Sequence, residues 1–207
     1  MAPSTRRKAP TRARRLTVWL LAAVMIGAGG YLALRPYFRH AVKELRLPLQ
    51  HDDIIRQQSR DKGIDPSLIA AVIYTETHFR PRDSPAGAVG LMQITPATAD
   101  FIAHKSGGVR FETRDLATPQ INIAYGTWYL RYLLRRFDAN VLLGLAAYNG
   151  GEGNVERWVA ESKARGEDFT VDAIPFTETR EYVGKVLDAQ ARYREQWWRE
   201  LGLPDPR

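Results

Sequence analysis

Apolar residues after position 65 recur with the spacing of an α-helix. Asp65 and Pro66 predict its start, because aspartate is a common N-cap and proline is favoured at the first helical position. The apolar residues of one face are Leu68, Ile69, Val72 and Ile73. Glu76 falls on the same face near the end of the segment. A carboxyl in that position is expected to leave water in part, and desolvation raises the pKa of a carboxylic acid.

Similar periods predict helices along most of the remaining chain. The predicted ranges are 51–62, 96–104, a long helix from 119, an apolar helix from about 140 and a last long helix from 177. Glycines and mixed charge between 105 and 117 predict a surface loop. The chain has no heptads, internal repeats or alternating strand pattern, so the expected fold class is all-α.

An uncharged apolar run of nineteen residues, 16–34, stands near the beginning of the chain. Its length suits a bilayer span, and the basic residues before it are expected to stay in the cytoplasm. A cleaved signal peptide is the competing interpretation, with small residues such as Ala28 and Gly30 before a possible cut. Either interpretation places the domain outside the cytoplasm, on the periplasmic or cell-wall side. The predicted parts are a basic cytoplasmic tail (1–15), a single-pass transmembrane signal-anchor (16–34), a tether (35–50) and one catalytic domain (51–207).

The formal net charge of +7 does not indicate a nucleic-acid partner, because its distribution is uneven. Six of the basic residues precede residue 16, so the rest of the chain is nearly neutral. The chain has no cysteine, which excludes disulfides, a thiol nucleophile and thiolate metal sites. The four histidines show no ligand spacing, so neither a metal nor an organic cofactor is expected.

Glu76 has two possible roles on these grounds. It could form an i,i+4 salt bridge with Arg80 at the helix end. Alternatively, a desolvated carboxyl still protonated near neutral pH can donate a proton to a leaving oxygen, as glycosidic cleavage requires. The following segment favours the second role, because Gly87 and Gly90 allow close backbone approach and Gln93 places an amide among apolar residues. A phosphate-binding loop is disfavoured, since the lysine of that motif is absent.

The segment around Glu76 resembles the first motif of the soluble lytic transglycosylase catalytic domain, which is related to goose-type lysozyme. Two departures are visible: Thr77 stands where the family more often has serine, and the spacing from Glu76 to Ser84 is one residue shorter than usual. The residues that carry the resemblance are Glu76-Thr77-x-Phe79, Ser84-Pro85-Ala86-Gly87-Ala88-x-Gly90-Leu91-Met92-Gln93-Ile94 and Pro96-x-Thr98.

Two later segments resemble the second and third motifs of the same family. On generic grounds the first is a glycine turn with Tyr148 as a core aromatic, and the other is a capped helix start. The resemblance implies instead that the Tyr148 hydroxyl faces the reacting sugar and that Asn149 holds the turn. It also implies that Glu178 shapes the cleft without direct chemistry. The matching residues are Ala146-Ala147-Tyr148-Asn149-Gly150-Gly151-Glu152-Gly153 and Pro175-Phe176-Thr177-Glu178-Thr179-Arg180-Glu181-Tyr182-Val183.

The resemblance implies a lysozyme-like helical domain that cleaves peptidoglycan glycan strands without consuming water. Glu76 would act as both acid and base, and the C6 hydroxyl of N-acetylmuramic acid would close a 1,6-anhydro ring. The implied substrate-binding residues are Ser84, Gly90, Met92, Gln93, Tyr148 and Asn149. A hydrolytic, lysozyme-like enzyme remains an alternative and would need a second acidic group, Asp83 or Glu152. A non-catalytic wall-binding module is disfavoured, because it would not need Glu76.

Overall fold

The computed structural model describes residues 46–107 and 112–206. The described residues from Leu47 onward form one compact unit. The predicted tail and transmembrane span lie outside the described residues. Within those residues, no helix combines the length and apolar character that crossing a membrane requires.

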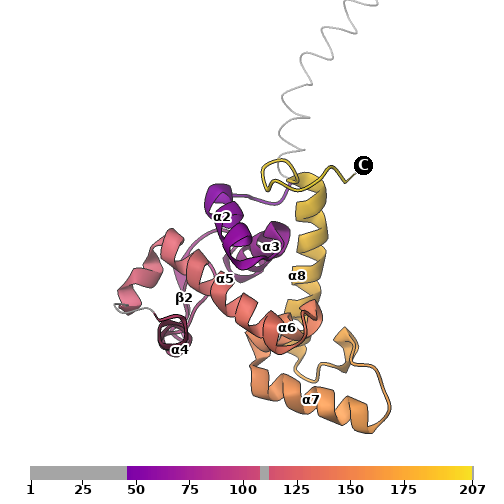
Figure 1. The fold of residues 1–207 in the computed structure, drawn as a ribbon. Helices are drawn as coiled ribbons and strands as arrows, with labels where there is room; N and C mark the ends of the chain where they lie inside the picture. Colours follow the sequence, from indigo (N-terminus) through magenta and orange to yellow (C-terminus); the bar gives the residue numbers. More distant parts are fainter. Residues whose placement is uncertain (1–45, 108–111, 207) are drawn as a thin grey trace, which may run out of the picture. The chain divides into compact units, whose positions relative to one another are not determined.

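The domain is mostly helical, as predicted, with a small antiparallel strand pair (Figure 1). Two-residue strands are too short to show alternation, which is why the sequence did not predict them. The predicted loop 105–117 is shorter than expected, because α4 extends to Ser106 and a 3₁₀ turn begins at Thr113. The elements are α2 Asp52–Lys62, α3 Pro66–Thr77, β1 Arg82–Asp83, β2 Val89–Gly90, α4 Pro96–Ser106, η1 Thr113–Ala117, α5 Pro119–Arg136, α6 Val141–Gly150, α7 Glu152–Ala164, η2 Val171–Ala173 and α8 Thr177–Gln196.

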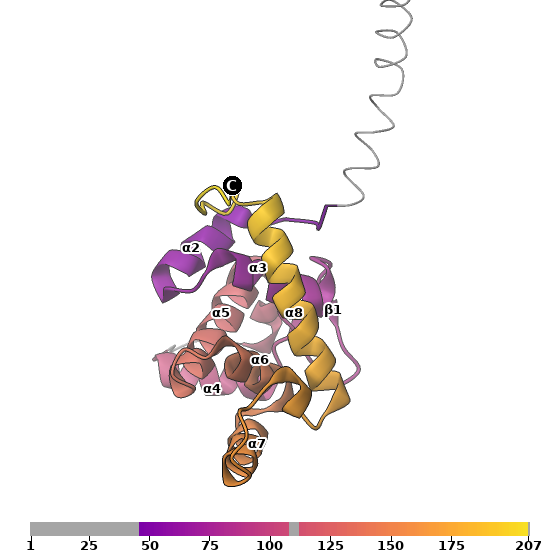
Figure 2. The same cartoon turned by 90° about the vertical axis from the view of Figure 1, so that its right-hand side faces the viewer.

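Helix α3 is the central element of the domain. Its N-terminus is capped as predicted, with the Asp65 side chain accepting from the backbone N–H of Ser67 at 2.9 Å. The helix is buried on nearly all sides rather than on one face, since every residue from Leu68 to Ile73 is at most 2% exposed. Both views show α8 running alongside α3 (Figures 1 and 2), and α2 packs against it as well. The last turn of α3 is therefore held in place by the core.

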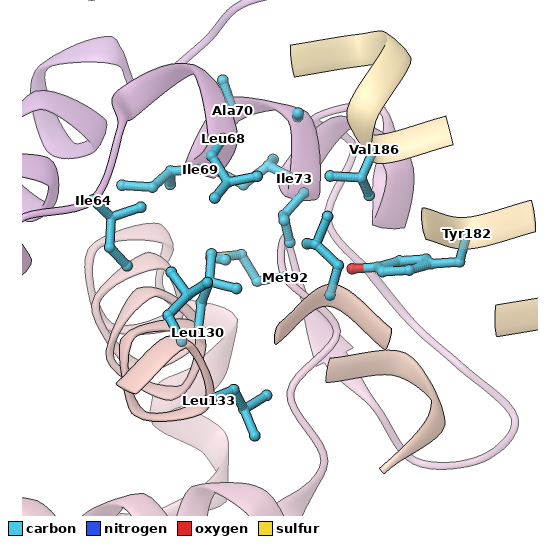
Figure 3. Close-up of a cluster of buried hydrophobic side chains, with 14 of the residues drawn as sticks. Ile64, Leu68, Ile69, Ala70, Ile73, Met92, Leu130, Leu133, Tyr182 and Val186 are labelled. Carbon is cyan, nitrogen blue, oxygen red and sulfur yellow. The ribbon is translucent and has the colours of Figure 1, made fainter. Parts of the chain in front are cut away.

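The core joins α3 to residues distant in sequence (Figure 3). Met92, from the loop after β2, lies close to Leu130 of α5. Tyr182 and Val186 approach from α8, and the Tyr182 hydroxyl oxygen points toward the rest of the cluster. Residues of the first and third motifs, Met92 and Tyr182, thus approach the C-terminal half of α3.

Candidate active site

Glu76 lies in the last turn of α3, where the chain bends sharply. His78 and Phe79 follow with φ of 53° and 59°, a left-handed conformation that is uncommon outside glycine. Contacts hold this bend: Phe79 is 1% exposed, and the Thr77 hydroxyl donates to the backbone oxygen of Leu91 at 2.8 Å. The bend ends the helix one residue after Glu76 and ties it to the loop after β2.

The environment of Glu76 keeps its carboxyl protonated to unusually high pH. The pKa of Glu76 is raised from 4.5 to about 7, chiefly by burial and with a smaller contribution from the nearby Glu178 carboxylate. The Tyr182 hydroxyl and the Arg82 guanidinium oppose this by lowering the same pKa. A pKa near 7 lets one carboxyl donate a proton and later accept one at neutral pH.

The alternative i,i+4 salt bridge between Glu76 and Arg80 is not formed. Helix α3 ends at Thr77, so Arg80 is outside the helical geometry that such a pair needs. Arg82 is the cation that acts on the carboxyl, and its guanidinium also donates to the backbone oxygen of Glu76 at 2.9 Å. Arg82, six positions after Glu76, is therefore the basic residue that interacts with it, whereas the i,i+4 interpretation expected Arg80.

Two of the predicted substrate-binding residues flank β2, with Ser84 in the turn before this strand and Gln93 in the loop after it. The Ser84 side-chain oxygen accepts from the Ala88 N–H at 3.0 Å, which closes the turn. Gln93 has φ 49°, and its amide nitrogen donates to the backbone oxygens of Arg82 at 2.7 Å and Gly90 at 2.9 Å. Both amide hydrogens of Gln93 are thereby engaged, which leaves its carbonyl oxygen as the group that can accept from a ligand.

Gly90 and Met92 face the protein interior rather than the surface. Gly90 has φ 77°, and a Cβ there would stand 2.3 Å from the Asn122 side-chain nitrogen. Met92 is fully buried, and its sulfur would lie 2.4 Å from a Cβ placed at Gly126. These two residues therefore act on the site by setting the path of the loop.

Asn122 of α5 holds this loop in place by hydrogen bonds. It is 1% exposed, and its side-chain oxygen accepts from the Met92 N–H at 2.8 Å. Its amide nitrogen donates to the backbone oxygens of Val89 at 2.9 Å and Leu116 at 3.0 Å. One side chain thus satisfies three backbone groups from β2, the motif loop and η1.

The second motif is joined to the first and the third by hydrogen bonds. The Tyr148 hydroxyl donates to the Met92 backbone oxygen at 2.9 Å, and the Asn149 side-chain oxygen accepts from the Thr179 hydroxyl at 2.7 Å. Burial raises the pKa of Tyr148 well above its usual value, and the Glu76 carboxylate adds to this effect. Tyr148 therefore lies close to Glu76, while Asn149 is exposed with its amide hydrogens available.

Tyr182 is a candidate site residue that the periodicity of the sequence did not distinguish from core. It is 7% exposed and its hydroxyl has no hydrogen-bond partner of normal geometry. That hydroxyl nonetheless lowers the pKa of Glu76. Its position four residues after Glu178, within the third motif, was the available signal.

Neither Asp83 nor Glu152, the candidates for a second catalytic carboxyl, is among the groups that shift the pKa of Glu76. Asp83 is exposed in β1, and Glu152 accepts from the Tyr132 hydroxyl at 3.3 Å at the start of α7. Among the charges of the described residues that shift the pKa of Glu76, Glu178 supplies the single carboxylate. In the same described part of the chain, no three His, Cys, Asp or Glu residues gather closely enough to hold a metal ion.

Comparison with known proteins identifies the family of the chain. Residues 53–170 match the family described as "Transglycosylase SLT domain", which covers more than half of the chain. The chain belongs to this family. The first two motifs around Glu76 lie within the matched residues, and the described domain has the lysozyme-like helical fold of that group.

The SLT domain is similar to larger proteins of this group. It is 38% identical over 154 residues to soluble lytic murein transglycosylase of Salmonella typhimurium, covering 73% of this chain and 24% of that protein. It is 34% identical over 171 residues to membrane-bound lytic murein transglycosylase C of Cronobacter sakazakii, covering 69% and 46%. The chain thus spans about a quarter of the soluble relative's length and less than half of the membrane-bound one.

Two solved structures of lytic transglycosylases are also similar to this chain. The 70 kDa soluble lytic transglycosylase of Escherichia coli has 37% identity and a TM-score of 0.68, over 72% of this chain and 24% of that one. Lytic transglycosylase Slt of Pseudomonas aeruginosa has 32% identity and a TM-score of 0.66, over 77% and 26%. The Pseudomonas structure is that of an inactive mutant in which glutamate is replaced by glutamine.

Proposed function

We propose that this protein is a peptidoglycan lytic transglycosylase. It cleaves the β-1,4 bond between N-acetylmuramic acid and N-acetylglucosamine and leaves 1,6-anhydro-N-acetylmuramic acid ends. The observation that carries the proposal is a single half-buried carboxyl, Glu76, with a pKa of about 7 at the meeting point of the three motifs. The inactive glutamate-to-glutamine mutant of the Pseudomonas relative supports the same type of chemistry.

Glu76 performs two proton transfers in the proposed reaction. In its protonated form it donates to the glycosidic oxygen as the bond to C1 of N-acetylmuramic acid breaks, with assistance from the acetamido group of that sugar. The carboxylate then removes the proton of the C6 hydroxyl as this oxygen bonds to C1. The proton balance returns Glu76 to its starting state, and no water is consumed. A carboxyl with a pKa near the working pH serves both steps well.

The remaining predicted residues orient the sugar or the loop that receives it. Gln93 offers its carbonyl oxygen and Asn149 its amide hydrogens, because their other polar atoms are already bonded within the protein. The Tyr148 hydroxyl donates to Met92 and can accept from the substrate, and the Ser84 hydroxyl can donate. Gly90 and Met92 contribute through the backbone path of the loop.

Product analysis tests this proposal against hydrolysis. The purified full-length chain is incubated with peptidoglycan, and the released muropeptides are measured by mass spectrometry. Intramolecular closure gives anhydro products without new reducing ends, whereas a hydrolase makes one reducing end for each bond cut. Reducing-end products in proportion to cleavage would show the transglycosylase mechanism to be wrong.

The proposed working location is the extracytoplasmic face of the membrane, with residues 16–34 as a retained anchor. The uncharged run and the basic residues before it support this topology. N-terminal sequencing of protein from the membrane fraction tests it. A mature chain that starts near Tyr31 and is released into the soluble fraction would contradict the anchor.

Two substitutions should move the pH profile of cleavage in opposite directions. The acid role requires protonated Glu76, so kcat/KM should fall as pH rises through about 7. Tyr182→Phe removes a group that lowers the pKa of Glu76, so this fall should move to higher pH. Glu178→Gln removes a like charge that raises that pKa, so the fall should move to lower pH. Profiles of kcat/KM between pH 5 and 9 measure both shifts. Shifts of the same sign in both variants would contradict the electrostatic assignment.

A further inference from the structure

The residues just before α2 are attached to the C-terminal end of α8 (Figures 1 and 2). The backbone N–H of Leu47 donates to the Gln196 side-chain oxygen at 2.9 Å, and the indole N–H of Trp197 donates to the Leu47 backbone oxygen at 2.8 Å. The Tyr193 hydroxyl donates to the backbone oxygen of Pro48. Leu47 is 3% exposed, so its side chain also belongs to the core. Hydrogen bonds and burial together therefore fix Leu47 and Pro48, which we call the entry segment.

The ring of Tyr193 contacts the end of α3 that carries Glu76. Tyr193 is fully buried, and its ring centroid lies 6.2 Å from that of Tyr74 and 6.2 Å from that of Phe79. Tyr74 precedes Glu76 by two residues, and Phe79 follows it by three. One side chain thus connects the entry segment, through its hydroxyl, to the aromatic residues on either side of Glu76, through its ring.

The bend after Glu76 depends on contacts of this kind. Phe79 has φ of 59°, a strained conformation for a bulky residue that persists only where the surroundings impose it. Tyr193 supplies one of these contacts, since aromatic pairs at such distances attract each other beyond the effect of burial alone. A displacement of Tyr193 would therefore loosen the bend and, with it, the last turn of α3.

We propose that Tyr193 is a positioning residue for Glu76, and that the entry segment holds Tyr193 in place. The inference rests on the proposed function. Tyr193 is not among the groups that shift the pKa of Glu76, so it acts through Tyr74 and Phe79 rather than on the carboxyl itself. Both sides of its contact with Pro48 lie outside residues 53–170, the part of the chain that matches the family.

The pKa of Glu76 reports whether the carboxyl keeps its position, because burial is the largest cause of its value of about 7. A substitution at Tyr193 leaves every group that faces the carboxyl unchanged. These titratable and charged groups are Arg82 of β1, Tyr148 of α6, and Glu178 and Tyr182 of α8. A lower pKa in such a variant would therefore show that Glu76 has gained contact with water.

Tyr193→Phe in the full-length chain is the test, because it keeps the ring and removes only the hydroxyl that bonds Pro48. The pKa of Glu76, followed by ¹³C NMR of its carboxyl, should fall toward 4.5, and the fall of kcat/KM with pH should move to lower pH by the same amount. At the pH optimum kcat should drop by roughly three- to tenfold, the scale of one hydrogen bond. KM should not change, since buried Tyr193 does not touch the glycan.

Two further variants separate this role from general packing. Leu47→Ala loosens the entry segment from its other side, so it should shift the pKa of Glu76 in the same direction. Its effect combined with Tyr193→Phe should be smaller than the sum of the two, because both act on one contact. Arg194→Ala is the matched control. It alters the next residue of α8, whose exposed ion pair with Asp65 reaches the opposite end of α3, and it should change neither the pKa nor kcat.

Each outcome of these measurements decides one claim. An unchanged pKa and kcat in Tyr193→Phe, even with a lower melting temperature, would overturn the positioning role and leave Tyr193 as a core residue. An equal shift in Arg194→Ala would also overturn it, because any loss of contact by α8 would then suffice. If Leu47→Ala does not fold, Trp197→Phe, which removes the N–H donor to Leu47, takes its place. If wild type releases no anhydro products, the proposed function fails, while the NMR titration still decides whether Tyr193 positions Glu76.

Discussion

Glu76→Gln is expected to abolish glycan cleavage while leaving the domain folded. Glutamine keeps the shape of the side chain and its hydrogen-bonding oxygen, but it can neither donate nor accept the proton that each step requires. General acid–base catalysis contributes about 10²–10⁴-fold for one transfer, and here one carboxyl serves both transfers. The expected loss is therefore at least about 10³-fold in kcat, measured as anhydro-muropeptide released per enzyme. Asp83→Asn is the matched control, because this exposed carboxylate has no assigned proton to move.

The same substitution should stabilise the protein above pH 7. The pKa of Glu76 is about 7 in the folded chain against an ordinary value of 4.5, so the folded state holds this proton more tightly than the unfolded state. The stability that this bound proton contributes to the folded state is fully present below about pH 4.5 and is lost as pH rises through about 7. The Glu76→Gln variant does not show this pH-dependent loss of stability, because glutamine has no charge to bury.

The size of that stabilisation follows from the pKa shift. At 1.36 kcal/mol per pKa unit the upper limit is about 3 kcal/mol, and partial contact of the carboxyl with water reduces it to about 1–2 kcal/mol. Glu76→Gln should then melt roughly 2–8 °C above wild type at pH 8, with little difference at pH 4.5. Thermal melts at the two pH values measure it. Equal melting temperatures at pH 8 would show that the ionised carboxyl carries no burial cost.

Local pattern was sufficient to predict the position of Glu76 but not the shape of the chain around it. The spacing of Val72, Ile73 and Glu76 indicated a carboxyl at the buried end of a helix, because helical period depends on residue type alone. The left-handed bend at His78 and Phe79 could not be predicted, since a bulky residue such as Phe79 rarely adopts that conformation and His78 alone does not require it. Tertiary contacts impose it.

The roles of several site residues depend on partners far along the chain. Tyr148 was expected to point its hydroxyl at the sugar, which stays a prediction, and the structure adds that this hydroxyl donates to the backbone oxygen of Met92, fifty-six residues away. Tyr182 looked like any core aromatic, because periodicity does not distinguish a tyrosine hydroxyl that faces a carboxyl from one that packs. The Asn122 side chain bonds three backbone groups of other segments. Contacts across such separations are not encoded in any local window of the sequence.

Asn122→Ala is expected to be the most destabilising single change near the site. It leaves the Met92 N–H and the backbone oxygens of Val89 and Leu116 without their partner in a buried setting. An unsatisfied buried polar group costs about 1–3 kcal/mol, so the expected loss in the free energy of unfolding is about 3–5 kcal/mol. Activity should fall with it, because the loop that carries Gln93 loses its attachment to α5.

Denaturant titration of matched variants measures this loss. Asn140→Ala removes an exposed helix cap, whose side-chain oxygen accepts from the Leu143 N–H at 3.2 Å, and should cost about 1 kcal/mol. Asn122→Asp can still accept from Met92 but cannot donate to the two carbonyls, so it should not restore stability. If Asn122→Ala cost no more than Asn140→Ala, the loop would be held by packing at Gly90 and Met92 alone. The hydrogen bonds of Asn122 would then be a consequence of the loop's position rather than its cause.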